Sequence, residues 1–193
     1  YVTNFLVKIR VTDRDVQLFK EVSHTFGSLR VAMVGVEAPA GQDLFGKDTV
    51  ERIATAHLTL VAGPSSAGRT TFSRRLTVQL LAAGISPFPL ELDNYFLERD
   101  RTPLDEDGKP DFEALEALDL ALLAEHLEKL IRGEEVQLPR FNFKSGMREA
   151  GEVIQLKRGQ LIILEGIHGL EPRLIPESLT SEAFRIYISA LTQ

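Results

Sequence analysis

Short apolar runs and longer helical stretches alternate along most of this chain, and the pattern changes character near residue 50. After that point, continuous apolar runs predict buried strands at 58–61, 88–92, 160–164 and 184–188. Apolar positions at helical spacing predict helices over 70–83 and 113–132, each followed by a glycine that can end a helix. Apolar strands separated by helices are typical of a parallel sheet with helices on both faces, so we expect an α/β domain over residues 51–193.

Residues 1–50 follow a different pattern and carry fewer apolar positions. Alternation over 1–11 predicts a half-buried strand, a short helix is expected before Gly27, and residues 30–36 predict a second strand. The stretch 37–48 has no periodicity and is interpreted as a loop. Because this segment is too small to bury a stable core of its own, we interpret it as a small, truncated α+β segment that precedes the main domain.

Composition narrows the class of protein. The 193 residues are 44% hydrophobic and 26% charged, which excludes wholesale disorder and collagen. Cysteine is absent, which excludes disulfides, zinc–thiolate sites and cysteine nucleophiles and fits a reducing, cytoplasmic compartment. No apolar run approaches the ~18 residues of a membrane span, and no basic-then-apolar leader opens the sequence. The net charge of −6 does not favour a nucleic-acid partner, so we expect a small-molecule substrate and leave a homo-oligomer open.

The strongest chemical signal is a glycine-rich turn between the first apolar strand and the first helix of the main domain. Its residues are Gly63, Pro64, Ser65, Ser66, Ala67, Gly68, Arg69, Thr70 and Thr71. Glycines let consecutive backbone N–H groups turn inward around a polyphosphate, and the N-terminus of the helix adds a positive end. The Thr70 hydroxyl is placed to bind Mg²⁺, as in other phosphate-binding loops. The turn therefore predicts a nucleoside triphosphate site, with a plain helix-starting turn as the alternative.

One position of this turn departs from the usual pattern. Phosphate-binding loops normally carry a lysine where this chain has Arg69. Lysine is a compact ammonium that fits between the β- and γ-phosphates, whereas arginine is a larger planar group. We expect Arg69 to keep the positive charge and the nucleotide affinity but to slow phosphoryl transfer.

Two carboxylates, Asp93 and Glu165, come at the ends of predicted strands. Ligands of open parallel sheets bind at the carboxyl ends of the strands, so both side chains are expected to face the ligand. Asp93 can accept a proton from a substrate hydroxyl or hold Mg²⁺ through water, and Glu165 can order Mg²⁺. Capping of a turn is the alternative for Asp93.

His168 is a further candidate for the substrate pocket, although a packed or surface histidine is the commoner case.

A series of motifs gives these residues a shared context. The segments lie at 63–71, 93–96, 102–112, 115–119, 138–144 and 165–170. In this order and spacing the chain resembles the uridine kinase/phosphoribulokinase family of phosphate-loop kinases, and within it the bacterial branch whose kinase-like domain follows an N-terminal extension. The resemblance covers roughly residues 57–193.

The resemblance implies ATP- or GTP-dependent phosphorylation of a nucleoside 5′-hydroxyl with Mg²⁺. It implies Asp93 as the general base, Thr70 as a Mg²⁺ ligand and Glu165 as an acid that supports the metal or the substrate. The residues implied for the nucleoside pocket are Tyr95 or Phe96, Glu113 near the ribose hydroxyls, and Arg148 beside the base.

Two departures from the family pattern bear on the acceptor and on closure of the site. Uridine kinases carry a tyrosine where this chain has Phe141 and a histidine near Gly146, and both side chains read the pyrimidine edge. Phe141 can stack on a base but cannot hydrogen-bond to it, and hydrogen-bonded readout is what discriminates steeply between substrates. The family also continues beyond 189–193 into an arginine-rich lid, so we expect either that this sequence is a fragment that stops before the lid or that the lid is missing.

Three functions are therefore consistent with the sequence. The leading prediction is a Mg²⁺- and ATP-dependent nucleoside kinase of the uridine kinase type. The second is a kinase of another small hydroxyl substrate, such as a sugar phosphate. The third, suggested by Arg69, is a nucleotide-binding module with little or no turnover.

Overall fold

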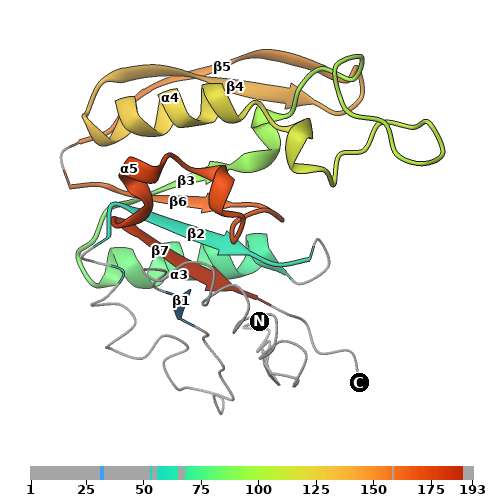
Figure 1. Cartoon of the computed structure of the whole chain (residues 1–193). Helices are drawn as coiled ribbons and strands as arrows, with labels where there is room; N and C mark the ends of the chain where they lie inside the picture. Colours follow the sequence, from blue (N-terminus) through green and yellow to red (C-terminus); the bar gives the residue numbers. More distant parts are fainter. Residues whose placement is uncertain (1–30, 33–52, 54–55, 65–67, 158, 189–193) are drawn as a thin grey trace, which may run out of the picture.

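The computed structural model describes residues 31–32, 53, 56–64, 68–157 and 159–188. These residues form a five-stranded sheet, a separate two-stranded hairpin and helices on both faces of the larger sheet (Figure 1). The order of the larger sheet is β1–β7–β2–β6–β3, and every neighbouring pair of strands is parallel. This arrangement confirms the expected α/β architecture.

The buried strands follow directly from the apolar runs of the sequence. The strands are β1 (Val31–Ala32), β2 (Leu58–Ala62), β3 (Pro87–Glu91), β6 (Leu161–Glu165) and β7 (Ala183–Tyr187). All residues of β2 are buried, as expected of a strand that is covered on both faces. Each of the four predicted strands of the main domain is confirmed within one residue at either end.

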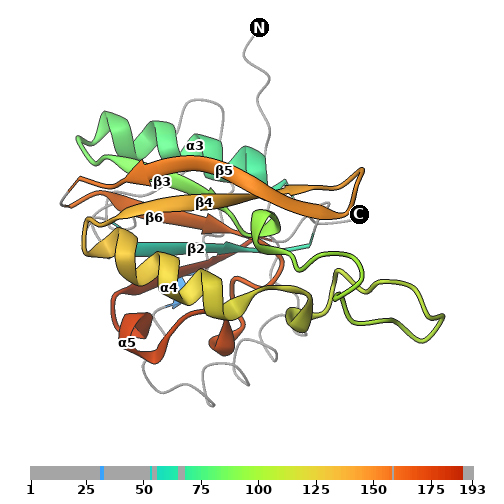
Figure 2. The same ribbon diagram turned by 90° about the horizontal axis from the view of Figure 1, so that it is seen from above.

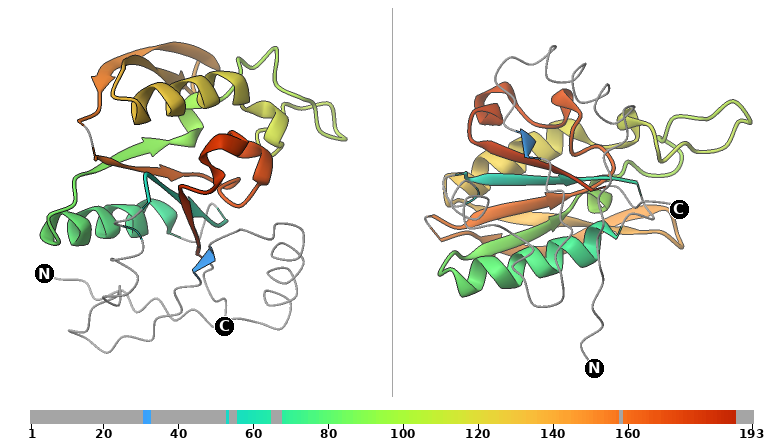
Figure 3. Two further views of the ribbon diagram at one scale, coloured as in Figure 1. Left: turned by 60° about the vertical axis from the view of Figure 1, so that its left-hand side comes forward. Right: turned by 90° about the horizontal axis from the view of Figure 1, so that it is seen from below.

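Helices cover the two faces of the sheet with separate apolar clusters. On one face, Leu76 and Leu80 of α3 (Arg69–Ala82) pack against β6 and β7. The opposite face is covered by α4 (Leu120–Ile131) and α5 (Glu177–Thr180). Figures 2 and 3 show α3 and α4 on opposite sides of the strands. Within the described ranges, no helix combines the length and the apolar character needed to cross a membrane.

The predicted helix over 70–83 is confirmed, including its glycine end. The N–H of Gly84 donates to the Leu81 carbonyl at 3.0 Å, and the N–H of Ile85 donates to the Leu80 carbonyl at 2.9 Å. Gly84 has a φ of 78°, so it supplies the left-handed residue that such a C-terminal motif needs. Ile85 then packs against the same apolar cluster as Leu80.

The helix predicted over 113–132 is shorter than expected at its N-terminus. Residues 115–117 form a separate 3₁₀ turn, and α4 begins only after Asp119. The Asp119 carboxylate accepts a hydrogen bond from the Leu122 N–H at 3.1 Å and an ion pair from Arg148 at 2.8 Å. Its own N–H donates to the Tyr95 carbonyl at 2.8 Å. The prediction was wrong here because the leucine spacing runs on through the 3₁₀ turn without a break. The helix itself begins only where Asp119 caps its N-terminus.

The hairpin of β4 (Glu135–Asn142) and β5 (Met147–Gln155) was not predicted. It lies over α4, on the side of the molecule away from α3 (Figures 1 and 3). Its inner residues Val136 and Phe141 join the apolar cluster of α4, whereas most of β5 is exposed and polar. A register shift between Gln137 and Pro139 also breaks the alternation that would have marked β4 as a strand.

Most of the residue 1–50 segment lies outside the described residues, including the expected strand over 1–11 and the expected helix before Gly27. Of the strand predicted over 30–36, the described part is β1, which pairs with β7 at the edge of the main sheet. The division into two segments stays a prediction.

Asp119 is expected to stabilise the fold through both of its contacts. Replacing it in Asp119→Ala removes the cap of α4 and the partner of a partly buried arginine, which should lower the free energy of unfolding by about 1–3 kcal/mol. Burial alone would raise the pKa of Asp119, but the Arg148 and Leu122 contacts outweigh it and lower the pKa. The stabilisation should therefore be present above pH 4 and be lost as the pH falls through the lowered pKa.

Urea denaturation at neutral and acid pH measures this contribution. Asp107→Ala, at an exposed position, is the matched control and should change the free energy of unfolding by less than about 0.5 kcal/mol. Equal effects of the two substitutions would contradict the role given to Asp119.

Candidate active site

The carboxyl ends of three neighbouring strands bring the predicted site residues together. Glu165 ends β6 and lies in register with Val61 of β2 on one side and Glu91 of β3 on the other. The glycine-rich turn follows β2, and Asp93 lies in the 3₁₀ turn Leu92–Tyr95 that follows β3. All three features therefore meet at the edge of the sheet where ligands of parallel α/β proteins bind.

The glycines at the two ends of the glycine-rich turn are required by the backbone. A Cβ at Gly63 would collide with the Ile188 carbonyl oxygen, and the φ of Gly63 is 152°. Gly68 has a φ of 77° and immediately precedes the first residue of α3. Pro64 is exposed, and Ser65, Ser66 and Ala67 lie outside the described residues. The glycine-rich segment thus connects the end of β2 to the N-terminus of α3, and a helix N-terminus is a setting in which backbone N–H groups bind phosphate.

Thr70 and Glu165 are in direct contact. The Thr70 hydroxyl donates a hydrogen bond to Glu165 Oε1 at 2.9 Å, while Glu165 Oε2 is buried and has no hydrogen-bond partner. Mg²⁺ prefers oxygen ligands and is commonly bound through one or two carboxylates plus substrate phosphates. A hydroxyl, a carboxylate with an unused oxygen and the nearby Asp93 are donors that fit this cation. Thr71 is exposed in the same first turn of α3.

Arg69 presents unused hydrogen-bond donors beside these oxygens. Its Nε and Nη1 are buried and have no hydrogen-bond partner. The guanidinium also lies close enough to Asp93 to lower the pKa of that carboxyl, which places the two groups on the same site. A buried, unpaired donor is unfavourable unless a ligand completes it, and an anionic phosphate oxygen is the acceptor that a guanidinium prefers. Arg69 therefore fits a phosphate group.

Asp93 has the electrostatic setting of a proton acceptor. Removal of water by the surrounding protein is the main cause that raises its pKa, and the nearby Glu165 carboxylate raises it further. Arg69 and His168 act in the opposite direction but do not cancel the rise. The Asp93 side chain stays accessible to solvent, as a group that takes a proton from a substrate must be.

His168 lies in the loop that follows β6, close enough to Asp93 to lower the pKa of that carboxyl. Burial lowers the pKa of His168, so the ring is held neutral more firmly than an ordinary histidine, and its Nε2 is buried without a hydrogen-bond partner. Glu171 and Glu116 oppose this effect, which shows that both carboxylates lie near the ring. Asp111 is a third nearby acid. These three acids were not predicted as site residues, because none of them directly follows a predicted strand, which was the signal that marked Asp93 and Glu165.

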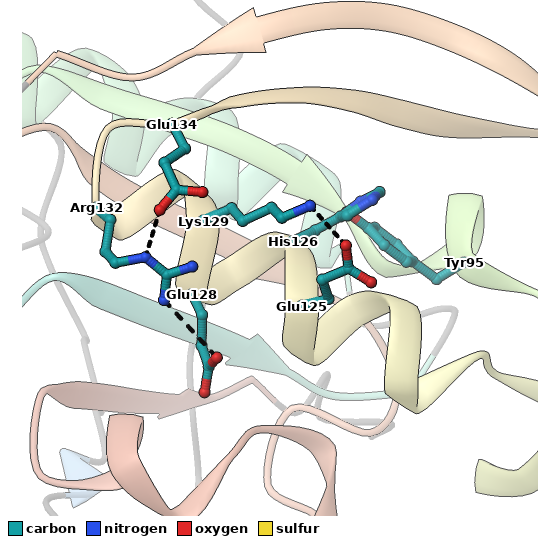
Figure 4. Close-up of polar contacts among 7 residues, drawn as sticks. All are labelled: Tyr95, Glu125, His126, Glu128, Lys129, Arg132 and Glu134. Carbon is teal, nitrogen blue, oxygen red and sulfur yellow. Dashed lines mark hydrogen bonds and ion pairs between the residues drawn. The ribbon is translucent and has the colours of Figure 1, made fainter.

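The aromatic candidates for a nucleoside pocket are placed differently from one another. Tyr95 has no exposed surface, and its hydroxyl lies 3.2 Å from His126 Nδ1 on α4. Figure 4 shows the two side chains next to each other. Phe96 and Phe141 pack edge to face with ring centroids 5.6 Å apart. Phe143, at the end of the same group of rings, is 58% exposed. The available aromatic surface is thus that of Phe143 rather than of Tyr95.

The polar candidates for the nucleoside pocket, Arg148 and Glu113, also differ in whether their side chains are free to contact a ligand. The Arg148 guanidinium on β5 forms an ion pair with the Asp119 carboxylate, so its charge is already paired. The Glu113 side chain is exposed, and its backbone N–H donates to Asp111 Oδ1 at 2.9 Å. This hydrogen bond anchors the segment that carries Glu113 beside Asp111, which lies near His168.

The sheet, the glycine turn and the convergent carboxylates together define an α/β fold of the P-loop type. A model of the Phosphoribulokinase / Uridine kinase family matches residues 58–190, more than half of the chain, and the chain belongs to this family.

Individual relatives agree with this assignment. The chain is 29% identical over 119 residues to the uridine kinase of Halobacterium salinarum, a match that covers 62% of this chain and 51% of that protein. It is 32% identical over 116 residues to the uridine kinase of Oceanobacillus iheyensis, covering 60% and 54%. The chain thus spans about half the length of the curated relatives it matches. A solved structure of a possible uridine kinase from Bacillus stearothermophilus has the same fold, with a TM-score of 0.55 and 18% identity over 73% of this chain and 79% of that one.

The closeness of the two carboxylates leads to a prediction about protonation. Because the charge of Glu165 raises the pKa of Asp93, the substitution Glu165→Gln should lower the pKa of Asp93. Carbon-detected NMR titration of the aspartate carboxyl signals measures this shift. Glu106→Gln, in the exposed loop, is the matched control and should leave the Asp93 signal unchanged. An Asp93 pKa that does not respond to Glu165→Gln would show that the carboxylates do not share a site.

Proposed function

We propose that this chain carries an ATP- and Mg²⁺-dependent kinase site that transfers the γ-phosphoryl group to a hydroxyl of a small acceptor, with the 5′-hydroxyl of a nucleoside as the leading candidate. One observation carries the proposal. Arg69, Thr70, Asp93 and Glu165 converge at the carboxyl edge of the parallel sheet, directly beside the glycine turn. Membership of the family and the uridine kinase relatives support the same reaction class.

Asp93 would act as the general base. In phosphoryl transfer the acceptor hydroxyl loses its proton as its oxygen bonds to the γ-phosphorus, and the bond to the leaving β-phosphate oxygen breaks. A carboxylate whose pKa is raised is a stronger base than an ordinary aspartate, and Asp93 is raised mainly by burial. Asp93 takes the proton at its carboxylate, while the neighbouring Glu165 accepts the hydrogen bond from the Thr70 hydroxyl.

The remaining groups would bind and neutralise the phosphates. The unpaired Nε and Nη1 of Arg69 donate to phosphate oxygens, and the backbone of the glycine turn binds the rest of the triphosphate. Thr70 and Glu165 would hold Mg²⁺, which when bound neutralises charge on the β- and γ-phosphates. Because the transition state demands positioning and charge neutralisation rather than covalent catalysis, these residues supply what the reaction needs.

The nature of the acceptor is part of the proposal. Phe141 is 5% exposed and packs among Phe96, Phe112 and Phe143, so no polar group at this position reads a base edge. This observation favours loose discrimination among acceptors and keeps a second candidate, a kinase of another small hydroxyl compound such as a sugar phosphate. A coupled assay of ADP release over a panel of nucleosides, sugars and sugar phosphates, with ATP and GTP as donors, separates the two candidates.

Asp93 is expected to be needed for transfer but not for nucleotide binding. Asp93→Asn keeps the shape of the side chain and removes its basicity, so turnover should fall by about 10²–10⁴-fold. The affinity for ATP–Mg²⁺, measured by isothermal titration calorimetry, should stay within about threefold, since other residues bind most of the triphosphate. Asp105→Asn, at an exposed loop position, is the control and should keep full turnover. Unchanged turnover in Asp93→Asn would remove Asp93 from the role of base.

Arg69 tests whether the phosphate-binding turn is a weakened catalytic loop. Arg69→Lys restores the compact ammonium usual in such loops, and we expect turnover to rise by about tenfold while the affinity for ATP stays similar. Arg69→Met removes the charge and should lower both. If Arg69→Lys lowers turnover instead, the site depends on the guanidinium of Arg69, and the loop is not a weakened one. If no ADP is released by either protein while ATP still binds, the chain is a nucleotide-binding module.

A further inference from the structure

A second arginine lies in the sheet itself, beneath the loop that carries His168. Arg185 belongs to β7, pairs with Leu60 of β2 and Val31 of β1, and is only 1% exposed. Its strand neighbours Phe184 and Ile186 point into the apolar cluster on the α3 face. Side chains alternate along a strand, so the guanidinium of Arg185 points to the opposite face, where the loop after β6 crosses the sheet.

The charge of Arg185 has no carboxylate partner among the described residues. Its Nη1 donates a hydrogen bond to the Gly169 carbonyl at 2.7 Å, and its Nη2 is buried without a partner. Glu171 lies near enough to raise the pKa of Arg185, but burial outweighs this and lowers it to about 10, so the side chain stays charged at neutral pH. A buried charge without an ion partner costs stability, and an apolar side chain of similar size is commonly neutral or better. Fold stability alone therefore does not explain an arginine at this position.

The hydrogen bond to Gly169 closes a tightly fitted segment. The N–H of Gly166 donates to the Val61 carbonyl at 3.1 Å, which anchors the start of the loop on β2. At the other end, a Cβ on Gly169 would lie 2.9 Å from the Ala62 side chain, so the loop rests directly on β2. Arg185 contacts the carbonyl at this second point. Between the two anchors lies His168, and the loop begins at Glu165.

We propose that Arg185 is a positioning residue, which holds the Gly169 carbonyl so that Glu165 and His168 face Asp93 and the phosphate-binding turn. The inference rests on the proposed kinase site. In it, Arg185 touches neither nucleotide nor acceptor, and its effect reaches the reaction only through the loop. Arg185 should therefore influence the rate of transfer more than the affinity for ATP, because the backbone of the glycine turn stays in place.

The matched variants are Arg185→Met, which removes the donor and the charge, and Arg185→Lys, which keeps a charged donor. In Arg185→Met we expect kcat to fall about tenfold with the KM for ATP within about twofold, and the melting temperature to stay within a few degrees. Arg185→Lys should recover a large part of kcat. A purely structural role would instead lower the melting temperature and leave kcat of the folded fraction unchanged, and that outcome would overturn the proposal.

A readout that does not depend on turnover is the imidazole NMR spectrum. The His168 ring signals should move in Arg185→Met, while those of His57 and His126, which lie elsewhere, stay in place. Gly169→Ala disturbs the same loop from the side of Ala62 with Arg185 intact, and it should move the His168 signals as well. If the chain shows no kinase activity, these signals still decide whether Arg185 positions the loop. Unmoved His168 signals in a folded Arg185→Met protein would refute the inference.

Discussion

In-register parallel pairing of β2, β6 and β3 is the constraint on which the rest of this site depends. Because Glu165 lies level with Val61 and Glu91, the segments that follow the three strands start from the same height at one edge of the sheet. The 2.9 Å hydrogen bond from Thr70 to Glu165 then ties the first turn of α3 to the end of β6. A slip of one strand by one residue would reverse the side-chain faces and separate these groups.

Electrostatics in the site is a balance between the two carboxylates, Asp93 and Glu165, and the guanidinium of Arg69. Asp93 is pushed toward the protonated form by burial and by Glu165, and toward the charged form by Arg69. Neither effect removes the other, so the carboxyl keeps a raised pKa while still facing a cation. In the proposed reaction, a carboxylate with a raised pKa beside a guanidinium would suit a base that takes a proton close to the transferring phosphoryl group.

The sequence predicted those parts of the fold in which apolar residues fill both faces of a strand or one face of a helix. Buried strands such as β2 and β6 are continuous apolar runs, and the glycine turn is recognisable by composition. The hairpin was missed because β5 is exposed on one face, and because the register shift near Pro139 hides the alternation of β4. The start of α4 was misplaced because the leucine spacing does not reveal that Asp119 caps the N-terminus of the helix.

The same reasoning explains which site residues could be predicted. Asp93, Glu165 and the turn are found from their position after strands, which is a local signal. The burial of Tyr95 against His126 (Figure 4) and the pairing of Arg148 with Asp119 join residues about thirty positions apart, and nothing in one sequence shows such contacts. Arg185 belongs to the same class, since its hydrogen bond to Gly169 joins a strand and a loop that only the folded chain brings together.

Asp119 has a mechanical consequence for the side of the site that would receive the acceptor. A single carboxylate caps α4 and grips Arg148 of β5, and the N–H of the same residue bonds to Tyr95, two positions after Asp93. The hairpin, the helix and the turn that carries Asp93 are thereby joined at one residue. The β4–β5 hairpin should consequently tilt together with the Asp93 turn as one stiff body, instead of swinging as an independent flap.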